Sequence, residues 1–384
     1  MSVEGGRPTP GATSEGVARL ALLDLMRTVA LLRVVAYHVT GLDPLTWLAS
    51  MPVMFFVAGS LFARSMQRRR GLLVVRDRFR RILPSLFAYA AVLVGLYAAL
   101  GLLTGSSGSV RDAAGWITEL GVYDTARLFV PVISLEPPVG PGDPDQAVFW
   151  TWNALWYVHT HLLLAAIGPL LIMAYKRWFP PMWIVLGVLW TLDAVANQGV
   201  ANTNTFLLFF VAGFSFDDGR LLEIPSRRLK QVTVGAAVLG LALIPLGEGM
   251  AINTWAPSLL LVGMAWVTGC LAWRGPLEQV AVGRLFAPLI AFVNRRALTI
   301  YLWSLLGVYV SRLLWPPEGG WFDLAWIALA SLALTAVLTV AACILVGWIE
   351  DLAARRPMEW WPRRGATPTA GGRAQPGSGV EPTT

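Results

Sequence analysis

Long apolar stretches recur along this chain of 384 residues, and they constrain its fold more than any other feature. A helix of about 20 residues spans a bilayer core of about 30 Å. Hydrophobic residues make up 56% of the chain and charged residues only 14%, whereas an average soluble domain has about a quarter charged residues. The sequence therefore predicts an all-α, polytopic integral membrane protein and excludes an ordinary soluble, disordered or fibrous chain.

About ten of these stretches are predicted to be transmembrane helices. They cover residues 19–40, 44–64, 82–104, 151–174, 181–197, 203–217, 231–247, 256–273, 297–312 and 322–349. We expect one transmembrane domain at 19–350, a disordered tail at 1–18 and a largely disordered cytoplasmic tail at 351–384. Residues 105–150 are expected to form a loop outside the membrane, and this loop is either a lid over an outward-facing site or a plain connector.

The positive charges predict the orientation, because Lys and Arg gather in cytoplasmic loops. With the N-terminus in the cytoplasm, 25 of the 30 Lys and Arg lie inside, three lie outside and two lie within the first stretch. Both termini are therefore expected to be cytoplasmic in a multi-pass protein of the cell membrane. This distribution explains the net charge of +7 without nucleic-acid binding. The only cysteines, Cys270 and Cys343, have no spacing typical of a metal site or a disulfide framework.

Charged side chains inside a membrane indicate function, because each costs at least about 2.5–3.5 kcal/mol at a helix centre. The first stretch carries Asp24, Arg27, Arg33 and His38. Arg27 and His38 share a helical face and lie about 16 Å apart along the axis. This spacing predicts a groove with a cation at one end and a base at the other, and Asp24 is spaced to pair with Arg27. The alternative is a structural ion pair with an interfacial histidine.

Three more polar residues lie in predicted spans. His159 and His161 are about 200° apart on a helix, so they do not converge on one ion and no metal site is predicted. One of them, His161 in our prediction, is expected to face a polar cavity. Asp193 either orients His38 or satisfies a local hydrogen bond, and Asp43 is another candidate to orient His38.

Arginines are unusually dense after the second stretch, where eight occur between residues 64 and 81. The guanidinium fork of arginine binds phosphate through two hydrogen bonds. Arg78 and Arg81 share a helical face. A phosphorylated cytosolic ligand and anionic lipid headgroups are the two interpretations of this cluster.

Together these blocks resemble acyltransferase family 3, a family of integral membrane acyltransferases. The similarity spans about residues 19–350 and departs from the family at Trp303-Ser304, at Ala58 and at Arg33. The matching motifs are Arg27-x10-His38, the aromatic-then-Gly segment 52–59, Arg78-x-x-Arg81, Leu155-Trp156-Tyr157 and the segment 295–302.

The resemblance implies O-acyl transfer from acyl-CoA, with acetyl-CoA as the expected donor, to a hydroxyl of a sugar or another envelope or secreted molecule. It implies that His38 is the general base, that Arg27 is catalytic and that Arg78 and Arg81 bind the phosphates of acyl-CoA. Acyl-CoA is then a co-substrate, no resident cofactor is expected, and the partners are the acceptor and membrane lipids. The alternative is a transporter with Arg27, His38 and Asp193 as a proton or substrate path, although the inverted repeats of transporters are not visible.

Overall fold

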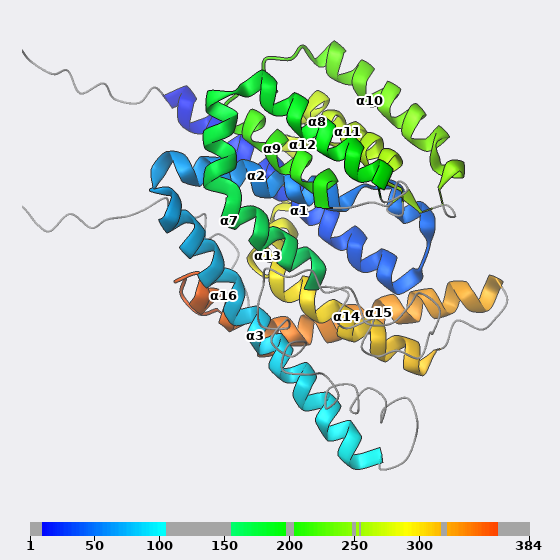
Figure 1. Cartoon of the computed structure of the whole chain (residues 1–384). Helices are drawn as coiled ribbons and strands as arrows, with labels where there is room; N and C mark the ends of the chain where they lie inside the picture. Colours follow the sequence, from blue (N-terminus) through cyan, green and yellow to red (C-terminus); the bar gives the residue numbers. More distant parts are fainter. Residues whose placement is uncertain are drawn as a thin grey trace, which may run out of the picture.

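The computed structural model describes residues 10–104, 155–196, 203–247, 251–252, 255–315 and 321–359. Figure 1 shows that this part of the chain is a helical bundle. Its elements are α1 (Pro10–Thr40), η1 (Asp43–Trp47), α2 (Ser50–Arg68), α3 (Gly71–Thr104), α7 (Leu155–Arg177), α8 (Phe179–Ala196), α9 (Thr203–Asp217), α10 (Ser226–Ala242), η2 (Ile244–Leu246), α11 (Ala256–Ala272), α12 (Arg274–Val282), α13 (Ala287–Arg295), α14 (Ala297–Leu314), α15 (Trp321–Leu345) and α16 (Gly347–Ala353).

Several of these helices are long and apolar enough to cross a membrane. Among the described residues there are five such segments, at Asp43–Arg68, Leu155–Arg177, Phe179–Ala196, Ser226–Leu246 and Ala325–Leu345. The pairs α11–α12 and α13–α14 bend by 76° and 81°, and counting each pair as one span raises the number to seven. The all-helical prediction is thus confirmed for the described residues.

The ends of the predicted transmembrane domain need correction. The first helix begins at Pro10, so residues 10–18 are helical and not part of a disordered tail; proline suits the first turn of a helix, where its missing N–H costs nothing. The last predicted stretch, 322–349, is broken after α15, and the chain continues in α16 and stays described to residue 359. The loop 105–150 and residues 151–154 lie outside the described residues.

The centre of the bundle is the contact between α2 and α9, whose backbones approach closely because glycines face each other. A Cβ atom on Gly59 would lie 1.8 Å from the carbonyl oxygen of Phe210, and one on Gly213 would lie 2.3 Å from that of Phe56. Small residues are the usual means of bringing membrane helices together. Aromatic side chains such as Phe62 and Phe210 fill the space around this contact.

The chain reverses sharply between α1 and α2, and Arg33 holds the reversal in place. Gly41 has a φ of 65°, which glycine adopts without the strain that other residues incur. The Nε of Arg33 donates to the carbonyl of Leu45, and its guanidinium lies 5.2 Å from the ring centre of Tyr37. Arg33 therefore has a structural role that the sequence did not show.

Candidate active site

Six of the described helices, α1, α2, α3, α7, α14 and α16, meet at a cavity of about 150 Å³. Helix α3 runs along one side of the bundle and packs against α7, α14 and α16 (Figure 1). The polar side chains around this cavity are Arg27 from α1, Arg78 and Arg81 from α3, Tyr157 and His161 from α7, Tyr301 from α14 and Glu350 from α16. Four sequence-predicted residues, Arg27, Arg78, Arg81 and His161, are thus brought together.

The cavity carries an excess of positive charge. Arg27 and Arg78 are half-buried, and Arg81 is exposed. Within the described residues, none of these three arginines lies within 4.0 Å of a carboxylate oxygen, and Glu350 is the carboxylate that lines the cavity. Two positive charges therefore remain uncompensated in partly desolvated surroundings, an arrangement that favours an anionic ligand.

The pKa shifts of Arg78 and Glu350, which lie just outside the predicted spans, are consistent with this excess of positive charge. Burial, and then the neighbouring Arg81 and Arg27, lowers the pKa of Arg78 to about 10, so the side chain stays charged at neutral pH. Burial raises the pKa of Glu350, while the nearby Arg27 and two hydrogen bonds from Thr299 oppose this rise. Glu350 is consequently a weaker counter-charge than an exposed carboxylate would be.

Aromatic side chains also line the cavity. The ring centres of Tyr157 and Tyr301 are 5.0 Å apart, and those of Tyr157 and His161 are 5.9 Å apart. The Nδ1 atom of His161 is buried and has no hydrogen-bond partner among the described residues. His159, two residues earlier, is buried and does not line the cavity. The two histidines thus lie in different surroundings, with His161 on the cavity side.

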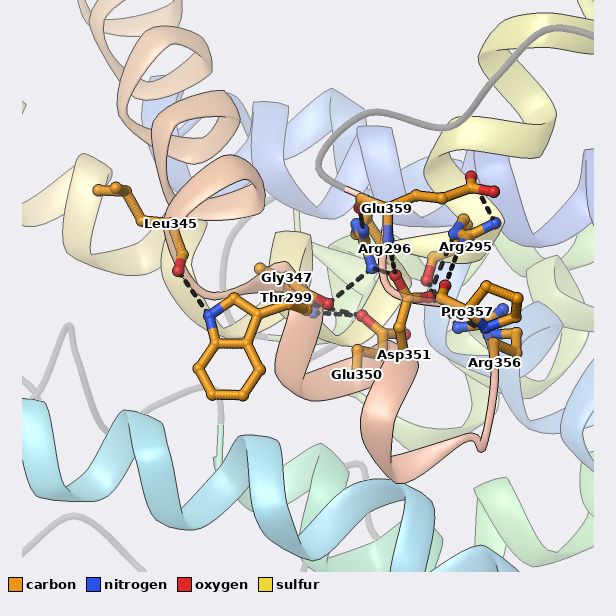
Figure 2. A network of polar contacts seen from close by, with 11 residues as sticks. Arg295, Arg296, Thr299, Leu345, Gly347, Glu350, Asp351, Arg356, Pro357 and Glu359 are labelled. Carbon is orange, nitrogen blue, oxygen red and sulfur yellow. Dashed lines mark hydrogen bonds and ion pairs between the residues drawn. The ribbon is translucent and has the colours of Figure 1, made fainter.

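The segment after the last long helix folds back as a cap (Figure 2), and its Glu350 lines the cavity. Glu350 accepts hydrogen bonds from the backbone N–H and the hydroxyl of Thr299, at 3.3 and 3.0 Å. These bonds fix the carboxylate against the first turn of α14, where the N–H groups of a helix are free to donate. Residues 351–359, the first part of the tail that was expected to be largely disordered, belong to this cap.

An ion-pair network holds this cap, with Asp351 at its centre (Figure 2). Its carboxylate lies 2.9 Å from Arg296, 3.1 Å from Arg295 and 3.4 Å from Arg356. Asp351 and Arg296 have no exposed side-chain surface. Arg296 also donates to the carbonyl of Gly347 at 2.6 Å. Sequence reasoning missed the network because a charged segment after an apolar helix is typical of a solvated tail.

The other predicted residues lie outside this cavity. His38 is half-buried near the end of α1, its ring 5.4 Å from that of Tyr37. The backbone carbonyl of Asp24 accepts a hydrogen bond from Thr28 within α1 and another from Asn294, and the second ties α13 to α1 beside Arg27. No ion pair of 4.0 Å or less joins Asp24 to Arg27 within the described chain.

Asp193 has a polar partner on the next helix. Its carboxylate accepts a hydrogen bond from the side-chain amide of Asn204, at 2.6 Å. Helix α8, which carries Asp193, packs against α7 and α9. This contact is a local hydrogen bond of the kind that the sequence allowed for Asp193.

Glu350, Tyr157 and Tyr301 complete the polar lining that sequence reasoning had only begun. Both tyrosines fall in motifs that were recognised for other reasons, and Glu350 was not singled out at all. The only available signal for it was the pair Glu350-Asp351 placed directly after a long apolar run.

The described residues thus combine helices that are apolar enough to cross a membrane with a cavity lined by three arginines. A family model described as "Acyltransferase domain", that of acyltransferase family 3, matches residues 20–348. The chain therefore belongs to this family of membrane acyltransferases, as its motifs predicted. Comparisons with curated proteins and with solved structures gave no match.

Proposed function

We propose that this protein transfers an acetyl group from acetyl-CoA to a hydroxyl of a sugar or another envelope or secreted molecule. The observation that carries the proposal is the cavity with three guanidinium groups and one carboxylate. Phosphate groups of an acyl-CoA supply the negative charge that Arg27, Arg78 and Arg81 lack, and arginine binds them through paired hydrogen bonds.

The proposed topology has ten spans with both termini in the cytoplasm, and the cell membrane is the proposed location. The 25 positively charged residues expected inside support this orientation. In that frame the arginine cavity faces the cytoplasm, where acyl-CoA is available. His38 lies about 16 Å further along α1, toward the outer side.

His38 is the proposed general base. The pantetheine arm of the donor extends from the arginines along α1 and places the thioester near His38. His38 takes the proton from the acceptor hydroxyl, and the oxygen attacks the thioester carbonyl carbon. The carbon–sulfur bond then breaks, and the departing thiolate receives the proton from the imidazolium. A positioned base of this kind contributes about 10²–10⁴-fold in rate.

The test is mass spectrometry of envelope sugars and secreted metabolites from cells with the wild-type protein, without it and with His38→Ala. We expect an acetylated product that disappears in the null strain and in the variant, while the variant still inserts in the membrane. Thr40→Ala is the matched control, because Thr40 is at the same helix end and its hydroxyl bonds to nearby backbone groups, donating to the carbonyl of Ala36 and accepting from the N–H of Leu42. Full acetylation with His38→Ala would refute the role of His38.

A further inference from the structure

A second polar cavity, of about 680 Å³, adjoins the first. It lies between the end of α2, the first turns of α3 and the segment that follows α16. Arg78 and Arg81 line both cavities, so the two form one continuous cationic surface. We call this second cavity the outer groove. Its further arginines are Arg68, Arg69, Arg76, Arg80 and Arg355.

The outer groove also has more positive charge than its own carboxylate can balance. Asp77 lies 2.7 Å from Arg69 and 3.4 Å from Arg80, and so it is shared by these two arginines. Arg68, Arg76 and Arg355 are exposed, and none of them has a carboxylate within 4.0 Å among the described residues. Three guanidinium groups thus face the groove without a protein anion.

Arg355 reaches the groove through an unusual backbone conformation. Its φ is 54°, in the left-handed region that residues other than glycine rarely adopt. The neighbouring Arg356 fixes the turn, because its backbone N–H donates to the carbonyl of Asp351 at 2.9 Å and its side chain donates to that of Arg295 at 3.3 Å. Conformations of this kind persist where the surrounding structure enforces them, often at binding sites. Arg355 also lies beyond residues 20–348, which match the family.

We propose that the outer groove binds the 3′-phosphate on the ribose of the donor coenzyme A, with Arg355, Arg76 and Arg68 as its ligands. This inference rests on the proposed function, because it assigns the donor's second phosphate group. Coenzyme A carries a pyrophosphate and a separate phosphate monoester on one nucleotide. The first cavity and the outer groove offer two adjoining sets of arginines without a carboxylate partner, one for the pyrophosphate and one for the phosphate monoester. A monoester approaches two negative charges at neutral pH and presents three acceptor oxygens.

The experiment measures binding to the full-length protein purified in detergent, which requires no knowledge of the acceptor. Radiolabelled acetyl-CoA is the probe, and unlabelled coenzyme A and dephospho-coenzyme A compete with it. For the wild-type protein we expect dephospho-coenzyme A to bind about tenfold more weakly or worse, the loss typical of a charge-assisted contact. In Arg355→Gln the ratio of the two dissociation constants is expected to fall toward one, and Arg355→Lys should retain part of it.

Arg227→Gln is the matched control, because Arg227 is an exposed arginine at the start of α10 that lines neither cavity. It removes the same charge and should leave the ratio as in the wild type. Equal affinity of the wild-type protein for the two competitors would overturn the inference, as would an unchanged ratio in Arg355→Gln.

The other source of a phosphate is a lipid headgroup, and native mass spectrometry separates the two. If the wild-type protein binds the two competitors equally and Arg355→Gln loses bound phosphatidylglycerol, the groove is a lipid site and the inference fails. Failure of the wild-type protein to bind acetyl-CoA at all would contradict the proposed function itself. The two failures are therefore distinguishable.

Discussion

Replacing Asp351 by asparagine removes the charge at the centre of the cap. Asp351 and Arg296 are both without exposed side-chain surface and lie 2.9 Å apart, so Arg296 loses its counter-charge inside the protein. Removing one partner of a buried ion pair costs about 3–5 kcal/mol. We expect a loss of about 3 kcal/mol, because Arg296 keeps its hydrogen bonds to the carbonyls of Gly347 and Glu359. Arg295 and Arg356 are partly exposed, so the loss of their ion pairs with Asp351 adds less to the destabilisation, since water replaces these contacts.

The expected result for Asp351→Asn is a lower melting temperature in detergent and faster trypsin cleavage after Arg355. Trypsin reports on the cap directly, because its cleavage needs the backbone of α16 and the following turn to open. Glu223→Gln is the control, since it removes one negative charge from an exposed position outside the network. If Asp351→Asn matched the wild type in both melting temperature and cleavage rate, the assignment of Asp351 as the centre of the cap would be refuted.

Two further predictions concern helix packing and pH. Gly59→Ala would place its Cβ atom 1.8 Å from a backbone oxygen of α9, which cannot rotate away. We expect a loss of about 1–3 kcal/mol or more, whereas Gly187→Ala, with open space around it, should not lower the melting temperature. Burial raises the pKa of Glu350 above its ordinary 4.5, so its contribution to stability is complete below about that pH and is lost as the pH rises through the raised value. In a scan of melting temperature against pH, Glu350→Gln should therefore lose less stability than the wild type as the pH rises above 4.5. Identical pH profiles for the two proteins would contradict the raised pKa of Glu350.

The sequence was sufficient to predict where the helices lie and part of the site. Apolar runs are local, so the predicted stretches coincide with described helices apart from shifted ends. The arginine pattern of Arg27, Arg78 and Arg81 indicated an anion site, and the structure places all three at one cavity. Helical spacing could indicate these residues because a charge in a membrane is costly and is therefore a candidate for function.

The cap was not predictable in the same way, because it depends on contacts between residues far apart in the chain. Arg296 and Asp351 are 55 positions apart in the sequence, and only folding brings them to 2.9 Å. The same holds for Glu350, which meets Thr299 through a turn after α15 that no local pattern indicates. In the sequence alone, the segment that carries the buried carboxylate of Asp351 cannot be distinguished from an ordinary charged tail.

Arg27 and His38, the two ends of the proposed site, both lie on α1, and contacts restrain this helix at two positions along its length. Beside Arg27, Asn294 donates hydrogen bonds to the Asp24 carbonyl and the Thr28 hydroxyl, at 2.9 and 2.8 Å. Toward the other end, Arg33 binds the carbonyl of Leu45 and fixes the turn that leads into α2. The separation of about 16 Å between Arg27 and His38 is therefore set by a helix restrained along its length. On the proposed function, the extended arm of the donor bridges that distance, so a donor with a shortened arm should still bind at the arginines but fail to transfer its acetyl group.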